Sequence, residues 1–139
     1  MPYHFNFFSN QTKAVWSGGT TTQLCIYPFD ELFAERGFIF RISTATVETE
    51  TSDFTGLPGF HRVLMILEGN LTIHHKDRYS KHLLPFDTDE FEGAWQTSAE
   101  GRVTDFNVIY SDKVKQVHVQ KLELQKGEQF PERNENDFT

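Results

Sequence analysis

Apolar and polar residues alternate along most of the chain with a period of two, the spacing that puts successive side chains on opposite faces of a β-strand. The clearest run is GFIFRISTATVET (37–49). One face of this run carries Ile39, Arg41, Ser43, Ala45 and Val47. If that face is buried, Arg41 is a charged residue that points into the protein from a small, otherwise uncharged surface.

Further segments have the composition of strands. They are TTTQLCIYP (20–28), the two halves of RVLMILEGNLTIHH (62–75), RVTDFNVIYS (102–111) and KQVHVQKLEL (115–124). Gly69 followed by Asn70 suits a tight turn between the two halves of the second segment. Short strands at near-regular spacing, with turn residues between them, indicate an all-β antiparallel sandwich or barrel.

Three segments depart from the alternation. PFDELFAERG (28–37) predicts one or two helical turns, with Asp30 as the cap and Gly37 as the stop. FDTDEFEGAWQTSAEG (86–101) is acidic and interrupted by Gly, which indicates a long loop or lid over one end of the barrel. The polar tail, 126–139, loses its periodicity, and we expect its end to be frayed.

Composition narrows the classes of protein further. The chain of 139 residues has the length of one domain, and its net charge of −7 argues against nucleic acid or an anionic membrane as the main partner. The N-terminus lacks the pattern of a signal peptide, and the longest apolar run, Val63–Leu67, is too short to cross a bilayer. Cys25 is the single cysteine, so no disulfide forms within the chain, and we expect a cytoplasmic protein.

His74 and His75 raise the question of a metal site. Adjacent residues on a strand point to opposite faces, so the two imidazoles cannot reach one metal ion unless a bulge intervenes. Metal-dependent β-barrel enzymes of the common type place two histidines at His-any-His spacing, which is absent here. The remaining histidines, at positions 4, 61, 82 and 118, have no partner at ligand spacing. We therefore expect a solvated strand end that continues into a charged loop, with no metal, no other cofactor and no catalytic residue.

Arg41 and Arg62 are the candidates for binding a small anion. Arg41 requires a carboxylate, either from the protein or from a ligand, because burying an unpaired charge is costly. Asp105 is the best internal candidate, and a purely structural pair between Arg41 and Asp105 stays open. Arg62 follows the Pro58-Gly59 turn at a barrel end, which suits a planar anion, and a plain surface arginine is the alternative.

Polar and aromatic residues near these arginines complete the candidate site. Asn107 shares a face with Asp105 and offers an amide, while Ser43 is small enough to leave room for a ligand. Trp16 precedes a glycine turn and either walls the pocket or packs against the core.

Four blocks of the sequence, taken jointly, resemble the HutD/Ves family. They are WSGGTTTQLCIYP (16–28), FRISTATV (40–47), SDFTGLPGFHRVLMILEG (52–69) and DFNVIY (105–110). The resemblance covers about residues 14–111. It implies a cupin-like antiparallel β-barrel, or jelly roll, without the metal ligands, in a family that is linked to histidine utilisation. Its members look like regulators that bind a small carboxylate such as N-formylglutamate or urocanate.

Carried over by position, the polar residues of the family pattern fall on the two candidate arginines and their neighbours. They are Trp16, Arg41, Ser43, Arg62, Asp105 and Asn107. Two departures matter. The family's usual Glu appears here as Gln23, in a shorter turn after the tryptophan, so the ligand preference is expected to differ. Family members also continue into a second, similar half, and residues 114–139 resemble the opening of that half in a single domain, 1–139.

Unpaired sheet edges in such a chain are a liability that self-association would cover. We therefore predict a homodimer in which residues 114–125 pair across the interface. Two other functions stay open beside the carboxylate-binding regulator: a metal-dependent cupin enzyme, which only fold analogy supports, and an interaction module that contacts a partner through the acidic segment 86–101.

Overall fold

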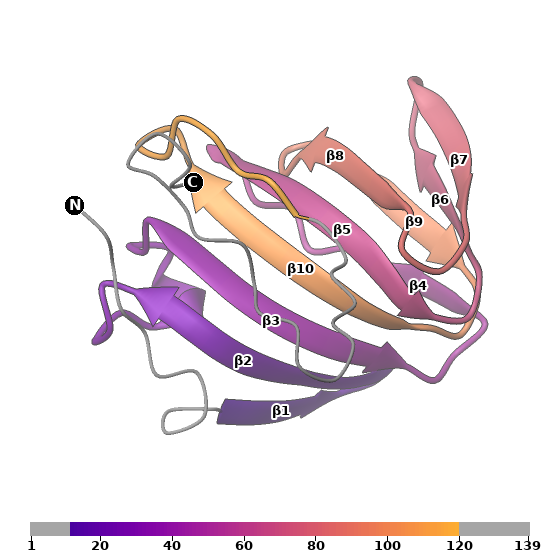
Figure 1. The fold of residues 1–139 in the computed structure, drawn as a ribbon, viewed down its shortest axis with the longest axis horizontal. Coiled ribbons are helices and arrows are strands. Elements are labelled where there is room, and N and C mark those ends of the chain that lie inside the picture. The colour runs from indigo at the N-terminus through magenta and orange to yellow at the C-terminus, as the bar shows by residue number, and fades with distance from the viewer. Residues whose placement is uncertain (1–11, 120–139) are drawn as a thin grey trace, which may run out of the picture.

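The computed structural model describes residues 12–119, which form ten strands and a single 3-10 turn (Figure 1). The elements are β1 (Thr12–Trp16), β2 (Gly19–Tyr27), η1 (Phe33–Glu35), β3 (Phe40–Val47), β4 (Thr51–Asp53), β5 (Phe60–Glu68), β6 (Leu71–His75), β7 (Tyr79–Leu83), β8 (Thr88–Glu92), β9 (Thr97–Glu100) and β10 (Thr104–Ser111). His4 and the polar tail lie outside the described residues. No helix between residues 12 and 119 has the length and apolar character needed to cross a membrane.

The strands form two antiparallel sheets. The larger sheet has the order β1-β2-β3-β10-β5-β8 and the smaller sheet the order β4-β9-β6-β7. In Figure 1 five strands of the larger sheet, β1, β2, β3, β10 and β5, run side by side across the molecule. Strands β6, β7 and β9 of the smaller sheet gather at its right-hand end. The prediction of an all-β antiparallel sandwich with at most a short helix is confirmed.

Two apolar clusters form the core, and the larger one packs residues of both sheets together. The larger one contains Val47, Leu64, Ile66, Leu71, Ile73, Leu83, Phe91, Ala99 and Val103. The smaller one contains Ile26, Phe38, Leu57, Phe60 and Ile109. Each fully buried aliphatic side chain contributes about 1.5–3 kcal/mol relative to an exposed one. The two clusters leave a polar region between them, which becomes important below.

The Gly69-Asn70 turn connects the two sheets rather than the two strands of a hairpin. β5 pairs with β10 and β8, whereas β6 pairs with β7 and β9. Gly69 has a positive φ of 86°, and a Cβ there would lie 2.5 Å from the carbonyl oxygen of Arg102. The tight turn expected from the sequence is therefore present, and it needs glycine because the chain passes closely over a neighbouring backbone.

The segment 28–37 holds one of the one or two helical turns predicted for it, with a different cap. Only Phe33–Glu35 is helical, as one 3-10 turn, and Leu32 rather than Asp30 precedes it. The backbone N–H of Ile39 donates to the carbonyl oxygen of Tyr27 at 2.7 Å, so this segment is a loop closed at both ends.

The lid predicted over 86–101 is also wrong, because this segment contains β8 and β9. Asp89, Phe91, Thr97 and Ala99 are buried, while the acidic residues between them are exposed. Side chains in this segment alternate between buried and exposed, as they do in the other strands, although one of the buried side chains is a carboxylate. The interaction-module hypothesis loses its premise, since 86–101 is not a free acidic loop.

The strand predicted over 115–124 is absent from its described part. Residues 112–119 have no regular secondary structure, and residues 120–124 lie outside the described range. The homodimer contact through 114–125 stays a prediction, and residues 120–125 lie outside the described range.

His74 and His75 do point to opposite faces of β6, as expected, but His75 is not solvated. It is 3% exposed, and its two ring nitrogens hydrogen-bond Asp89 at 2.7 Å and Thr97 at 2.8 Å. The hydroxyl of Tyr79 donates to the same Asp89 carboxylate at 2.7 Å. Residues 76–82 are likewise not a plain charged loop, since β7 starts at Tyr79 and pairs with β6. The prediction of a solvated His75 failed because its hydrogen-bond partners lie on β8 and β9, in the segment predicted to form a lid.

Candidate functional site

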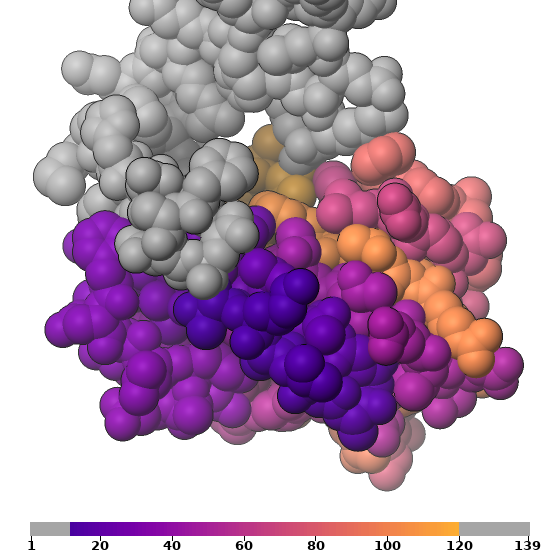
Figure 2. Space-filling view, turned by 90° about the horizontal axis from the view of Figure 1, so that it is seen from below, coloured from indigo at the N-terminus to yellow at the C-terminus, as the bar shows by residue number. Residues whose placement is uncertain are grey.

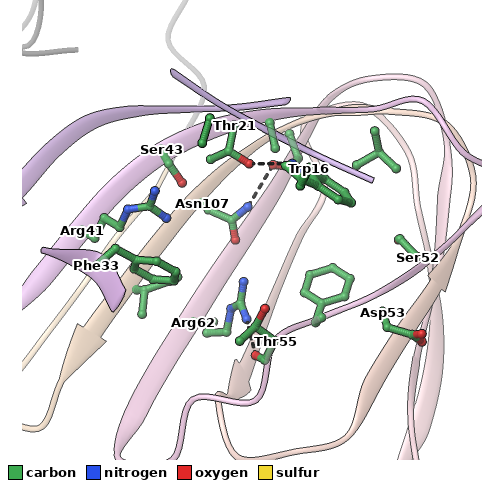
Figure 3. Close-up of a pocket in the computed structure, with 16 residues that line it drawn as sticks. Trp16, Thr21, Phe33, Arg41, Ser43, Ser52, Asp53, Thr55, Arg62 and Asn107 are labelled. Atoms are coloured by element: carbon green, nitrogen blue, oxygen red, sulfur yellow. Dashed lines mark hydrogen bonds between the residues drawn. The ribbon is translucent and has the colours of Figure 1, made fainter. Parts of the chain in front are cut away.

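A cavity of about 340 Å³ lies on the inner face of the larger sheet, between the two apolar clusters (Figure 3). β3, β10 and β5 form its floor, and β4 with the following residues 54–55 forms part of the opposite wall. The lining residues with polar side chains are Trp16, Thr21, Arg41, Ser43, Ser52, Asp53, Thr55, Arg62, Asp105 and Asn107. Polar groups therefore converge on a concave surface, as they do in small-ligand sites.

The strand register explains why the two arginines face the same cavity. Arg41 on β3 is paired with Ile109 on β10, and Ile109 is paired in turn with Arg62 on β5. The three residues form one row across adjacent strands, so the two arginine Cα atoms are about 10 Å apart, two strand spacings. Figure 3 shows the two guanidinium groups reaching into the space between them.

Uncharged side-chain groups contact the guanidinium of Arg41 on two sides. Its Nε donates to the Oε1 of Gln23 at 2.8 Å, and its guanidinium carbon lies 4.1 Å from the centre of the Phe33 ring. Burial, together with the nearby charge of Arg36, lowers the pKa of Arg41 to about 10. The side chain remains a cation at neutral pH.

Arg62 is more deeply buried, with 8% of its surface exposed. One terminal nitrogen donates to the carbonyl oxygen of Thr55 at 3.2 Å, and the guanidinium carbon lies 5.2 Å from the centre of the Phe54 ring. Burial lowers the pKa of Arg62 to about 10, while the charge of Asp105 raises it. Its Nε has no hydrogen-bond partner among the described residues.

Asp105 and Asn107 stand side by side on β10, with their side chains on the face that lines the cavity. The Nδ2 of Asn107 donates to the Oδ1 of Asp105 at 2.9 Å. Burial raises the pKa of Asp105 to about 7, although hydrogen bonds from Asn107 and from the backbone N–H of Ala45 and the charge of Arg62 all favour the carboxylate. The Oδ1 of Asn107 has no partner among the described residues.

The structural pair between Arg41 and Asp105 that the sequence left open is not formed. Asp105 is paired with Ala45, four residues further along β3 than Arg41, a separation of about 13 Å along the strand. Within residues 12–119, neither Arg41 nor Arg62 lies within 4.0 Å of a carboxylate oxygen. Both cations therefore line the cavity without an ion-pair partner among residues 12–119.

Trp16 forms part of the rim, on the exposed edge strand β1. Its indole Nε1 donates to the hydroxyl of Thr21 at 3.0 Å, across the turn that joins β1 and β2. A Cβ on Gly18 would lie 2.1 Å from the indole ring, so glycine at this position allows the ring to fold over the turn. In Figure 2 the residues of β1 and the start of β2, in indigo, form part of the molecular surface.

The structure brings together nearly all the residues singled out from the sequence. Trp16, Arg41, Ser43, Arg62, Asp105 and Asn107 line one cavity, and Gln23 stands behind Arg41 without lining it. The sequence analysis missed Phe33, Phe54 and Thr55, which support the guanidinium groups. These three residues come from irregular segments, where no periodicity indicates which side chains turn inward.

A second hollow of about 550 Å³ adjoins the first. The two share Trp16, Ser52 and Asp53, and the second is completed by Ser17, Gly18, Thr49, Thr51, His74, Ser98, Ala99 and Glu100. Across the described part of the chain, no three His, Cys, Asp or Glu side chains gather in a way that could hold a metal ion.

Comparison with known proteins gives a consistent result. The family model described as HutD matches residues 9–139. An uncharacterised 21.2 kDa protein from the hutC 3′ region of Pseudomonas putida is 35% identical over 79 residues, which cover 54% of this chain and 41% of that protein.

Solved structures are similar over the same region. HutD from Pseudomonas fluorescens SBW25, in a formate condition, has a TM-score of 0.63 and 27% identity, covering 75% of this chain and 58% of the other. Mannose 6-phosphate isomerase from Bacillus subtilis, a cupin, has a TM-score of 0.55 at 11% identity, which concerns the fold alone. The chain thus has the predicted cupin-like fold, and its match spans about half the length of these HutD-type relatives.

Proposed function

The chain belongs to the HutD family, a family associated with histidine utilisation, and from this premise we propose that it binds a small carboxylate between Arg41 and Arg62. The expected ligands are intermediates of the class of N-formylglutamate or urocanate, and the expected role is regulatory rather than catalytic. A cytoplasmic location, inferred from composition, is part of the same proposal.

The observation that carries this proposal is the pair of cations without counter-ions. Two guanidinium groups line one cavity from the same row of residues across one sheet, and no carboxylate of the described residues pairs with either. A buried charge is destabilising unless it is paired and hydrogen-bonded. Arginine presents several donors in a planar fork that matches a carboxylate. A guest carboxylate would supply both the charge and the acceptors that the described part of the chain does not.

The remainder of the cavity fits a short organic acid. Ala45, Ile109 and the rings of Phe33 and Phe54 provide apolar surface beside the arginines. The volume of about 340 Å³ is at the lower end of the range for small-molecule pockets.

The experiment that tests the proposal is a thermal-shift screen with glutarate, glutamate, formylglutamate and urocanate at millimolar concentration. A ligand that binds only the folded state raises the melting temperature by mass action. The informative variant is Arg41→Met combined with Arg62→Met, since methionine retains much of the side-chain volume and removes the charge. Loss of the shift in this double variant is the expected result.

The matched control is Arg78→Met combined with Arg102→Met. These two arginines are exposed and do not line the cavity, so the control removes the same net charge elsewhere. It should keep the full ligand-induced shift. Equal shifts in both double variants, or no shift with any acid in the unmodified protein, would contradict carboxylate binding at this site.

A further inference from the structure

Two buried polar atoms in the cavity have no partner among the described residues: the Nε of Arg62 and the Oδ1 of Asn107. Their residues are 8% and 7% exposed, so bulk water does not satisfy them. Native proteins leave few buried polar atoms unpaired, because each one loses its hydrogen bonds to water on folding. Two such atoms in one cavity indicate what a guest must offer.

The two atoms have opposite requirements. The Nε of Arg62 carries a hydrogen and can only donate. The Oδ1 of Asn107 can only accept, and the amide orientation is fixed because its Nδ2 donates to the Asp105 carboxylate at 2.9 Å. Figure 3 shows the amide of Asn107 and the guanidinium of Arg62 directed toward one another from β10 and β5. The space next to the anion site therefore contains both a donor and an acceptor in need of partners.

A simple carboxylate satisfies only half of this arrangement. Its oxygens accept from the arginines, but they have no hydrogen to give to the Oδ1 of Asn107 and would be repelled by it. A hydroxyl or an N–H group on the carbon next to the carboxylate would donate to that oxygen while the carboxylate faces the guanidinium groups. A cavity lined by hydrogen-bond donors alone would not require a donor on the guest. The acceptor oxygen of Asn107 is therefore the atom that distinguishes one acid from another.

We propose that the guest is a carboxylic acid with an O–H or N–H donor on its α-carbon, in the class of α-hydroxy, α-amino or α-acylamino acids, and that Asn107 selects it over plain acids. This inference rests on the proposed carboxylate binding between Arg41 and Arg62 and specifies its ligand. The alternative is a water molecule that bridges the two atoms and stays in place when any acid binds, in which case the α-substituent has no effect.

The test is isothermal titration calorimetry on the unmodified protein with four acids of the same charge: glutarate, α-hydroxyglutarate, α-methylglutarate and α-methoxyglutarate. The methyl compound controls for size, and the methoxy compound retains an acceptor without a donor. α-Hydroxyglutarate is expected to bind about tenfold more tightly than the other three, a difference of about 1.4 kcal/mol.

The variant Asn107→Leu removes the acceptor and keeps a similar volume. In this variant α-hydroxyglutarate is expected to bind no more tightly than glutarate, because the hydroxyl has lost its acceptor. The comparison of four acids needs no variant, so the inference stays testable if Asn107→Leu does not fold.

The outcomes separate the inference from the proposed function. Equal affinities for glutarate and α-hydroxyglutarate would overturn the selection by Asn107 and leave carboxylate binding intact. A preference that persists in folded Asn107→Leu would overturn it as well. Failure of all four acids to bind, or unchanged binding after Arg41→Met and Arg62→Met, would overturn the proposed function together with the inference.

Discussion

The Nε of Arg41 donates a hydrogen bond of 2.8 Å to the side-chain oxygen of Gln23 on the neighbouring strand. A neutral amide therefore orients this guanidinium and leaves its charge uncompensated. A carboxylate at the position of Gln23 would orient Arg41 equally well but would also neutralise it. The identity of this one residue thus decides how strongly the cavity attracts an anion.

Replacing Gln23 by Glu tests this relationship. Gln23→Glu is expected to weaken carboxylate binding by at least about tenfold, or ~1.4 kcal/mol, because the new ion pair with Arg41 competes with the guest. Calorimetric titration of the variant with formylglutamate or glutarate measures the change. Gln96→Glu adds the same charge on an exposed residue outside the cavity and should leave the affinity within about twofold. Equal losses in the two variants would mean that net charge, rather than the state of Arg41, controls binding.

Asp105 is expected to make the stability of the protein depend on pH. Its pKa in the folded protein, about 7, lies above its ordinary value of 3.8 because of burial. The folded state therefore holds this proton more tightly than the unfolded state. The resulting stabilisation is complete below about pH 4 and is lost as the pH rises to about 7, a loss on the order of 4 kcal/mol.

Urea unfolding of the wild type and of Asp105→Asn, at about pH 5 and pH 8, measures this effect. The free energy of unfolding should fall with rising pH in the wild type and fall much less in the variant, which has no proton to release at this position. Parallel pH dependences would show that Asp105 has a similar pKa in the folded and unfolded states.

The hydrogen-bonded pair of His75 and Asp89 is expected to be a major contributor to stability. Asp89→Ala removes the acceptor for both His75 and the hydroxyl of Tyr79, and it leaves buried polar groups without partners. The expected loss in the free energy of unfolding is about 3–5 kcal/mol. Denaturant unfolding of Asp89→Ala beside Glu90→Ala, whose residue is exposed, provides the comparison. The Glu90 variant should change by less than about 0.5 kcal/mol, and similar losses in both variants would contradict a special role for the pair.

Self-association stays a prediction from the sequence. β1 is an edge strand of the larger sheet with all five of its residues exposed, and such an edge can pair with another chain. We expect light scattering coupled to gel filtration to give the mass of a dimer at micromolar concentration. A monomer under these conditions would contradict the prediction. Deleting residues 114–139 would identify the contact, since only a dimer that depends on this segment should dissociate.

The floor of the cavity was predictable because it lies on regular strands. Strict alternation on β3 placed Arg41, Ser43, Ala45 and Val47 on one face, and all four line the cavity. The same rule put Asp105 and Asn107 together on β10. What alternation cannot supply is the register between strands. The register pairs Asp105 with Ala45, away from Arg41, and Arg41 hydrogen-bonds Gln23 instead.

The segments that were misread share a different cause. Asp89 occupies an inward position of β8, and a carboxylate there resembles loop sequence until its partner His75, on β6, is known. Phe33 and Thr55 enter the site from segments without periodicity, and their inward orientation follows from how the surrounding strands close. Local pattern thus predicted the strands correctly where each buried side chain was apolar or small, and failed where burial depended on a distant polar partner.

The most direct test of the account is the position of a bound acid in a crystal of the protein soaked with α-hydroxyglutarate or formylglutamate. The account predicts a carboxylate in the cavity, with its oxygens about 2.7–2.9 Å from guanidinium nitrogens of both Arg41 and Arg62. A cavity that contains only water at saturating ligand, or an acid bound elsewhere on the protein, would contradict it.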